Sequence, residues 1–471
     1  MKSIKYILTL FVILAAFSCS EDFIDKKPPL QMSNELSLSS YKNLQLAVNG
    51  AYAPLYDDEY YGRDFIVYAA IKGDNAKSST WKNSGRFQIE YNWDNNNANT
   101  IDVWQRGYQV IAAANNVINA LEGFEEPGVT QAQLDQLKGE SLFLRALAHF
   151  DLVRTYAQPY SHAKDGNTEL LGVPIIRETK IQEPERNTVV EVYEDLIVPD
   201  LLDAEKIIGD PERGTVSNGF ASKEAVQALL AKVYLYMENW DEAATYASKV
   251  INSGKFQLYS AAGYADAWGT DEATEVIFQV YGNLNQSYYP AFDEIGYMFE
   301  PVDGYGDVVA ATGLMNLFED GDVRADVFNT YSEYPGEQWS AKYPGKSKIN
   351  ENNIPVLRLS EMYLIRAEAV LNGANGNALA DYNAIRTSRG LTAAANVSLQ
   401  DVYNERRREL NFEGNALFDL ARLQKPLERI DEDVIGDAPQ TVPFPDDRWA
   451  GAIPIGELEA NPNIEPNPAY N

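Results

Sequence analysis

Cysteine and histidine are scarce in this chain of 471 residues, which contains one cysteine and two histidines. A single thiol, Cys19, allows neither an internal disulfide nor a zinc site built from several thiolates. The fold must therefore be stabilised by its core, and a chain of this length with 45% hydrophobic residues can bury a large one. No cofactor or metal site is predicted, because Asp320, Asp322 and Asp326 follow no EF-hand spacing and favour a solvated loop.

Motifs of nucleophilic catalysis are also missing. His149 lies at the edge of a helical stripe and His162 in a polar segment, and neither has a nucleophile motif nearby. The sequence therefore does not indicate an enzyme, and no catalytic residue is predicted. A glycosidase remains open, because two carboxylates at a fixed separation suffice for that chemistry and the chain has 69 acidic residues.

Positive charge is scarce relative to negative charge. The chain has 39 lysines and arginines against 69 aspartates and glutamates, which gives a net charge of −30. Binding of a phosphate backbone needs a concentrated basic surface, so nucleic acid is not an expected partner. The one basic cluster, Arg406 to Arg408, lies between Glu405 and Glu409 in a helical pattern and predicts a salt-bridged helix face.

The N-terminal hydrophobic run, residues 6–17, is too short to cross a bilayer, which needs about 20 apolar residues. Lys2 and Lys5 precede it, and the small residues Ala16 and Ser18 stand close before Cys19. This layout is typical of a bacterial lipoprotein signal. We therefore predict a signal peptide over 1–18 and acylation of Cys19. Each buried methylene of the lipid would contribute about 0.8 kcal/mol to membrane anchoring.

Helical periodicity dominates the chain after a polar tether over 19–40. Two amphipathic stripes, 226–237 and 240–251, are separated by a short break and predict an antiparallel helical hairpin. Small alanines on the second helix are typical of a tetratricopeptide-like repeat. A second hairpin is expected over 359–386. The expected helical parts are 41–252 and 356–424.

Residues 253–355, which we call the insertion, lose the helical period and are rich in Gly, Pro, Asn and Tyr. The segment is too long for a passive connection. The prolines after residue 425 predict an irregular C-terminal arm over 425–471. The fold class predicted is therefore mainly α, with tetratricopeptide-like hairpins in a superhelix and a loop-rich insertion containing short strands.

Several segments, taken in order, resemble the signatures of the SusD/RagB family, which are surface lipoproteins of Bacteroidetes. The resemblance covers nearly the whole chain and is specific because the segments follow one another in the same order. It runs from Cys19 through 139–156 (GESLFLRALAHFDLVRTY), 172–176 (GVPII), 229–236 (LLAKVYLY), 356–369 (VLRLSEMYLIRAEA), 405–410 (ERRREL) and 453–455 (IPI). In the signature 356–369, Arg358, Glu361, Arg366 and Glu368 are spaced so that opposite charges are expected to pair along one helix.

This resemblance implies a nutrient-binding protein rather than a catalyst. Members of the family sit as a hinged lid on a SusC-like TonB-dependent transporter in the outer membrane. They trap an oligosaccharide, or a peptide in the RagB branch, before import. We therefore expect a lipid-anchored protein that faces outward from the cell. Two alternatives stay open, namely a surface glycan hydrolase on a helical scaffold and a repeat scaffold that binds only protein.

Ligand contacts in the family commonly come from an early loop and from the irregular segment after the hairpins. A sugar ring has an apolar face on which an exposed Tyr or Trp can stack, while amides and carboxylates bind its hydroxyls. The early loop here is 72–81. The candidates are Asp74, Asn75 and Trp81 from this loop, and Tyr289, Tyr297, Tyr305 and Trp339 from the insertion. For each ring the alternative is a contact in the core, and for Asp74 it is a structural cap of a turn.

Overall fold

The computed structural model describes residues 38–211, 217–271 and 273–470. The expected signal peptide over 1–18, the lipid on Cys19 and the expected tether as far as residue 37 lie outside the described residues. Within the described ranges, no helix combines the length and the apolar character needed to span a bilayer.

The N-terminal part is a set of packed helices. Helix α6 packs along α7, α7 in turn packs on α10, and α3 packs against α6 and α7. Gly107 allows the close approach of α6 and α7, because a Cβ there would lie 2.9 Å from Cγ of Leu152. The long helices are α3 (Tyr41–Tyr52), α6 (Val103–Ala120), α7 (Gln131–Tyr156) and α10 (Val198–Ile207). The shorter segments are η2 (Ala53–Tyr56), α4 (Asp64–Ile71), α5 (Gln88–Asn92), α8 (Tyr160–Lys164), α9 (Val189–Glu191), η3 (Val192–Ile197) and η4 (Ser217–Gly219).

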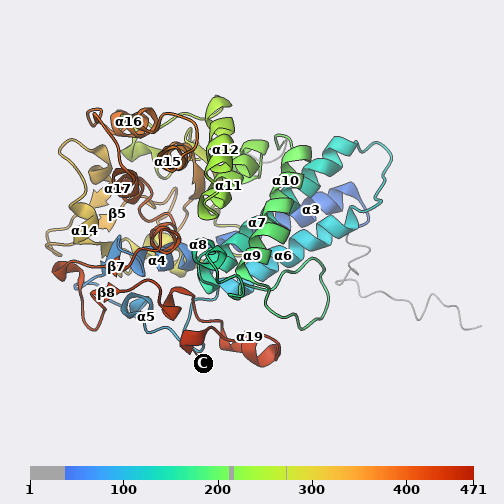
Figure 1. Cartoon of the computed structure of the whole chain (residues 1–471), viewed down its shortest axis with the longest axis horizontal. Helices are drawn as coiled ribbons and strands as arrows, with labels where there is room; N and C mark the ends of the chain where they lie inside the picture. The colour runs from blue at the N-terminus through green and yellow to red at the C-terminus, as the bar shows by residue number, and fades with distance from the viewer. Residues whose placement is uncertain (1–37, 212–216, 272, 471) are drawn as a thin grey trace, which may run out of the picture.

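The two helical hairpins expected from the sequence are present. The first joins α11 (Lys223–Tyr236) to α12 (Trp240–Asn252), and the second joins α15 (Leu359–Leu371) to α16 (Ala378–Ser388). Ser222 and Asn239 cap α11 and α12 by accepting hydrogen bonds from backbone N–H groups of the first turn. The small buried alanines of α12 let this helix pack closely between α11 and α15. The two hairpins therefore lie side by side, as Figure 1 shows. The predicted helical fold is confirmed.

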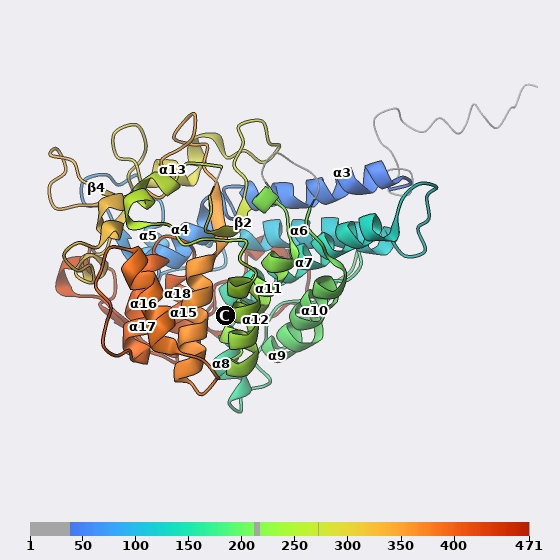
Figure 2. The ribbon, with the colours of Figure 1, turned by 90° about the horizontal axis from the view of Figure 1, so that it is seen from above.

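The insertion contains only short elements between its ends. Its helical turns are η5 (Ala261–Gly263), η6 (Ala265–Ala267), η7 (Ala291–Asp293), α13 (Ile295–Met298), α14 (Thr312–Met315) and η8 (Val323–Val327). After the second hairpin come α17 (Leu399–Glu409), α18 (Ala416–Arg422), η9 (Asp431–Asp433), η10 (Asp447–Trp449), α19 (Ile455–Ala460) and η11 (Pro468–Tyr470). Figure 2 shows the loops of the insertion along one edge of the molecule, opposite α15 and α17.

All sheets among the described residues are antiparallel pairs of short strands. Strand β1 (Ala76–Ser78) pairs with β3 (Val308–Ala310), which fastens the early loop to the insertion. Strand β2 (Val276–Val280) pairs with β6 (Ile354–Arg358), so residues 281–353 of the insertion begin and end at the same small sheet. The others are β4 (Phe328–Asn329) with β5 (Trp339–Ser340), and β7 (Leu427–Glu428) with β8 (Thr441–Val442).

A buried network of ion pairs joins the insertion to α17. The carboxylate of Glu409 lies 2.7 Å from Nη2 of Arg389, 3.0 Å from Nη1 of Arg358 and 3.2 Å from Nη1 of Arg324. Burial alone would raise the pKa of Glu409, but Arg389, Arg358 and Arg324 hold it well below its usual range. The other acids of the network are Glu275, Asp322, Glu405 and Glu413.

The prediction that charges would pair along the helix of 356–369 is wrong. Arg358 pairs with α17, Glu361 with Lys232 at 3.1 Å, and Glu368 with Arg422 at 2.6 Å. Arg366 pairs with Asp381 of α16. Glu361 and Glu368 are buried in the described structure, so each charge needs a partner on the element packed against it rather than one on its own exposed face.

The basic cluster differs from expectation in the same way. Arg406 is 1% exposed and pairs with Asp419 of α18, while Arg407 reaches the early loop. Arg408 alone pairs along the helix, with Glu405. The cluster is therefore a largely buried connection between elements and not a solvated helix face.

A second buried carboxylate, Glu294, caps α13 inside the insertion. It accepts hydrogen bonds from the backbone N–H of Gly296 at 2.7 Å and from Nδ2 of Asn352 at 3.0 Å, and the hydroxyl of Tyr56 lies 3.4 Å away. Burial raises the pKa of Glu294 to about 8 in spite of these bonds. The folded protein therefore holds a proton on Glu294 that the unfolded chain releases at lower pH.

The substitution Glu409→Gln should lower the free energy of unfolding by about 3 to 5 kcal/mol, because it leaves buried guanidinium groups without their shared partner. Urea denaturation at neutral pH measures this loss. The control is Asp203→Asn, which removes the exposed ion pair with Lys206 and should change stability by less than about 1 kcal/mol. Equal effects of the two substitutions would contradict the assigned role of the network.

The substitution Glu294→Gln should flatten the pH dependence of stability between about pH 5 and pH 8. In the parent protein the folded state binds more protons than the unfolded state over this interval, so stability falls as pH rises toward 8. Denaturation curves at several pH values measure the slope. Glu459→Gln, at an exposed position, serves as control. If Glu294→Gln and the parent lose stability in parallel, Glu294 does not hold the proton.

Candidate functional site

The early loop and the insertion meet at one surface, which contains most of the candidate residues. Strands β1 and β3 hold the two segments in register, and the N–H of Ser79 extends the pairing by donating to the carbonyl of Asp307. The carboxylate of Asp307 then accepts hydrogen bonds from the backbone N–H and hydroxyl of Ser84. Residues 79–84 are thus fixed against the insertion rather than extending freely from it.

Trp81 stands at the tip of this fixed turn with 52% of its surface exposed. Its indole N–H donates to the carbonyl of Pro335 at 3.2 Å. Glu337 accepts hydrogen bonds from the hydroxyls of Ser79 and Thr80 and from the N–H of Thr80, so one carboxylate of the insertion holds the turn. The ring of Trp81 is therefore both exposed and oriented, as a stacking platform requires.

Aromatic side chains of the insertion extend the surface beside Trp81. Phe292 is 68% exposed and contacts Tyr297, whose ring centroid lies 5.9 Å from that of Tyr305. The guanidinium of Arg86 lies 3.8 Å from the centroid of Tyr305. Tyr331 and Tyr334 contact each other next to Pro335. We call this set the aromatic strip; its members are Trp81, Phe292, Tyr297, Tyr305, Tyr331 and Tyr334.

Trp339 lies beneath the aromatic strip and is fully buried. Tyr331 and Tyr334 meet its ring with their centroids 5.6 and 5.8 Å away, and its indole N–H donates to the carbonyl of Gly306. Gly306 has φ of 61°, and a Cβ there would lie 2.7 Å from Pro301, so this turn requires glycine. In this conformation Trp339 supports the strip from below and presents no ring face to solvent.

Tyr289 is half-buried at the edge of the same region and packs on the main core. Burial raises its pKa, and the neighbouring Tyr297 adds to the rise. Tyr289, Tyr297, Tyr305, Trp339 and Trp81 are therefore brought into one neighbourhood, although only some of them face solvent.

Asp74 and Asn75 lie at the base of the early loop and contact α17. Arg407 pairs with the carboxylate of Asp74 at 3.1 Å and donates to the side-chain carbonyl of Asn75 at 3.0 Å. The hydroxyl of Tyr403 also donates to Asp74. Asn75 is 1% exposed, so in this conformation both side chains anchor the loop to the helix.

Sequence reasoning missed Phe292, Tyr331, Tyr334 and Arg86. The three rings belong to the Tyr-rich insertion. Tyr331 and Tyr334 are three residues apart, directly before Pro335 and Gly336, which is a pattern typical of a turn. Nothing in the sequence distinguished them from the rings that were chosen. The stacking of Arg86 on Tyr305 depends on the pairing of β1 with β3, and no local sequence pattern predicts this pairing.

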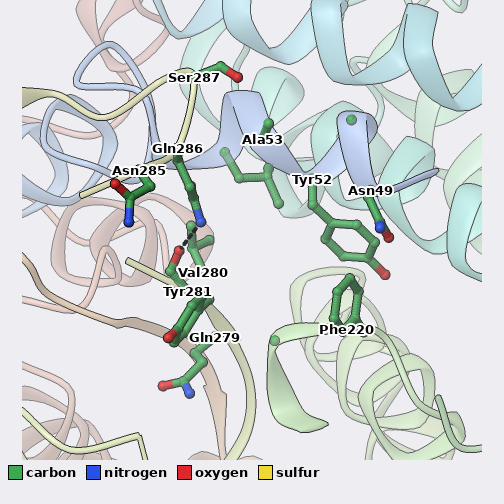
Figure 3. Close-up of a pocket in the computed structure, with 13 residues that line it drawn as sticks. Asn49, Tyr52, Ala53, Phe220, Gln279, Val280, Tyr281, Asn285, Gln286 and Ser287 are labelled. Carbon is green, nitrogen blue, oxygen red and sulfur yellow. Dashed lines mark hydrogen bonds between the residues drawn. The ribbon is translucent and has the colours of Figure 1, made fainter. Parts of the chain in front are cut away.

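A hollow of about 430 Å³ lies elsewhere, between the C-terminal end of α3 and the segment 279–287 (Figure 3). The rings of Tyr52 and Phe220 meet edge to face on one side of it, and Gln286 donates a hydrogen bond to the carbonyl of Tyr281 on the other. None of the seven residues chosen from the sequence lines this hollow.

Neither histidine has the surroundings of a catalytic base. His149 is buried in α7, where its Nδ1 lies 2.8 Å from the carbonyl of Arg145, and burial lowers its pKa to about 3. His162 packs edge to face on Phe444. Asp322 forms a bidentate pair with Arg324. In the part of the chain that the structure describes, no group of three or more His, Cys, Asp or Glu side chains is arranged to hold a metal ion.

Comparison with known proteins gives matches over most of the chain. A family model described as "Starch-binding associating with outer membrane" matches residues 22–235, and one described as "SusD family" matches 311–470. A SusD-like protein of Formosa agariphila, P2, is 24% identical over 99% of this chain and 100% of its own length. A SusD-like protein of Bacteroides ovatus is 25% identical over 89% of this chain and 82% of its own length.

Solved structures agree with these matches. A crystal structure titled as a putative sugar binding protein, from Bacteroides vulgatus, has a TM-score of 0.84 and 28% identity and covers 92% of this chain and 100% of its own. A SusD superfamily protein from Bacteroides thetaiotaomicron has a TM-score of 0.81 and 29% identity and covers 91% of this chain and 100% of its own. With both halves of the chain matched and the helical fold shared, the protein belongs to the SusD/RagB family.

Proposed function

We propose that this protein captures oligosaccharides at the outer surface of the cell through the aromatic strip, without breaking a bond in them. The observation that carries the proposal is the placement of Trp81, which is 52% exposed, oriented by its indole hydrogen bond and continued by further rings from the insertion. The descriptions of the matched family and of the putative sugar binding protein from Bacteroides vulgatus support a carbohydrate ligand.

The chemistry of the strip suits weak, reversible capture. One ring that covers about 50 Å² of a sugar face contributes roughly 1 to 1.5 kcal/mol. Two or three such contacts, with hydrogen bonds, correspond to a Kd in the millimolar to micromolar range, since 1 mM equals about −4 kcal/mol. Arg86, stacked on Tyr305, supplies donors for hydroxyl groups at the edge of the strip. A peptide with apolar side chains is the second ligand class that these rings would accept.

Of the candidates taken from the sequence, we propose Trp81, Tyr297 and Tyr305 as direct contacts. Tyr289 and Trp339 are proposed to position the rings of the strip, and Asp74 and Asn75 to anchor the loop that carries Trp81. This division follows from exposure and hydrogen bonding: Asn75 and Trp339 are buried, whereas Trp81 is half-exposed.

We further propose that Cys19 carries the lipid that holds the protein at the outer membrane, and that residues 19–40 act as the tether. The bound ligand would pass to a SusC-like TonB-dependent transporter, on which this protein acts as a hinged lid. Membership of the family supports both steps. The proposed segments are a helical part over 41–252, the insertion, a second helical part over 356–424 and the arm over 425–471.

Trp81→Ala and Tyr305→Ala should each weaken binding of the parent's best polysaccharide about tenfold, because each removes one stacking contact. Affinity gel electrophoresis with a panel of neutral and acidic polysaccharides selects the ligand, and calorimetry with its oligosaccharides measures the change. Leu46→Ala, which truncates an exposed side chain on α3, serves as control and should leave affinity unchanged.

Three results would contradict capture by the strip. If no polysaccharide gel retards the parent protein, but the protein binds a protein partner, it is a protein-binding scaffold. If it releases shorter saccharides, and one carboxylate substitution stops this release, it is a surface hydrolase. If Trp81→Ala and Leu46→Ala bind equally well, the ligand lies elsewhere.

Cys19→Ala should abolish labelling of the protein by a fatty-acid probe in cells and move the protein from the membrane fraction to the soluble fraction, because the proposed acylation needs this thiol. Ser20→Ala should retain the label and serves as control.

Affinity purification of the native protein from detergent-solubilised outer membranes should recover a TonB-dependent barrel. Retained labelling of Cys19→Ala would contradict the lipid assignment, and recovery of the native protein without a barrel would contradict the partnership.

A further inference from the structure

A second hollow, of about 510 Å³, is lined by the first half of α6, the segment 174–184 and the start of α19. Its volume lies within the range of small-molecule sites, about 300 to 1,000 Å³. It shares no residue with the aromatic strip. Trp104, Tyr108 and Ala112 of α6 form its floor, because they are four residues apart and lie on one face of the helix.

The wall opposite α6 is an arch that is fastened at both ends. On one side, Asn115 donates to the carbonyl of Ile176 at 2.9 Å and Thr179 donates to the carbonyl of Ala112 at 3.0 Å. On the other side, Asn461 donates to the carbonyl of Pro184 at 2.9 Å. The hollow is therefore preformed, and a ligand would not have to order this segment on binding.

The hollow has apolar walls between polar ones, and it offers little open ring surface. Trp104 is 3% exposed and packs 5.2 Å from Tyr108, centroid to centroid. The hydroxyl of Tyr108 is occupied by the carbonyl of Pro174 at 2.9 Å. The other apolar walls are Ile176, Pro174, Pro184 and Pro454. Such walls fit an aliphatic chain better than the flat face of a sugar, which needs an open ring.

Negative charge lines the end of the hollow where α6 begins. Asp102 is the N-cap of α6, and Glu457 of α19 receives a hydrogen bond from the indole of Trp104. None of the residues that the structure describes forms an ion pair with either carboxylate. Burial raises the pKa of Glu457, the bond from Trp104 partly offsets the rise, and the charge of Asp102 adds to it.

The one lysine of the lining, Lys180, does not neutralise these acids. Its ammonium lies 2.7 Å from the carboxylate of Glu178, and the two side chains are 60% and 63% exposed, so Lys180 is already paired at a solvent-exposed part of the lining. The hollow therefore combines apolar walls with two carboxylates, Asp102 and Glu457, that form no ion pair within the described residues, an arrangement that favours a positively charged ligand.

We propose that the hollow between α6, the segment 174–184 and α19 binds an organic cation, namely an ammonium or guanidinium group at the end of a short aliphatic chain. The cationic group lies beside Asp102 and Glu457, and the aliphatic chain lies along Tyr108 and the prolines of the arch. The site is separate from the strip and does not depend on what the strip binds.

The experiment uses two amides that differ only in the terminal ammonium group of the side chain: Nα-acetyl-lysine amide, which carries it, and Nα-acetyl-norleucine amide, whose side chain ends in a methyl group. Each is titrated into the folded, lipid-free protein and followed by ligand-detected NMR and calorimetry. The lysine amide should bind at least about tenfold more tightly at low salt, and the difference should shrink in 0.5 M NaCl, where charges are screened within a few ångström.

Glu457→Gln keeps the shape of the side chain and should weaken binding of the lysine amide about tenfold. Glu459→Gln removes the same charge from an exposed position of the same helix and should have little effect. Gly456→Phe adds a ring to a residue that lines the hollow and should block it; a Cβ at Gly456 meets no atom within 4 Å, so the substitution creates no clash at its Cβ. Asp102→Asn is a second charge variant that retains a side chain able to cap α6.

Denaturation midpoints near that of the parent show that the variants fold. Equal affinity for the two amides would overturn the proposal. So would the absence of binding of the lysine amide at any concentration up to its solubility limit. So would a loss in Glu459→Gln as large as in Glu457→Gln. Binding of a neutral oligosaccharide that Gly456→Phe blocks and Glu457→Gln leaves intact would assign the hollow to sugar instead. Variants of the strip should leave all of these results unchanged.

Discussion

The buried ion pairs around Glu409 are the constraint on which the rest of the structure depends. Three guanidinium groups from β6, from the end of α16 and from the insertion share this one carboxylate. None of them could be buried singly, because a lone charge in the interior costs several kcal/mol. Every acid and base of the network must therefore be in place at the same time, which fixes the insertion relative to the second hairpin and α17.

Charged and polar groups also set the geometry of the aromatic strip. Glu337 and Asp307 hold the turn that carries Trp81, Glu294 caps the helix that carries Tyr297, and Arg407 anchors the early loop. A loop that is fixed at so many points presents its rings without a large entropic cost on binding. Rigidity here comes from carboxylates inside the insertion rather than from regular secondary structure.

The sequence predicted the helical hairpins because apolar periodicity and a polar break are local signals. It failed for the charges of α15 and α17, since spacing along a helix does not show which element packs on each face. Arg358 and Glu361 looked like partners, yet each pairs with a different segment. For the rings the outcome was mixed: the polar flanks of Trp81 indicated exposure, but nothing local separated buried Trp339 from half-buried Tyr297. The arch over α6 was missed because its fastening depends on Asn115 and Asn461, which are far from it in sequence.

The pairing of β2 with β6 has a consequence for how such proteins diversify. The middle of the insertion, residues 281–353, begins after Val280 and ends before Ile354, two residues that lie opposite each other in the same small sheet. A segment with adjacent exit and entry points can be lengthened, shortened or exchanged while the hairpins keep their positions. All rings of the aromatic strip except Trp81 lie between these two residues, so their number and positions can change while the helices stay in place.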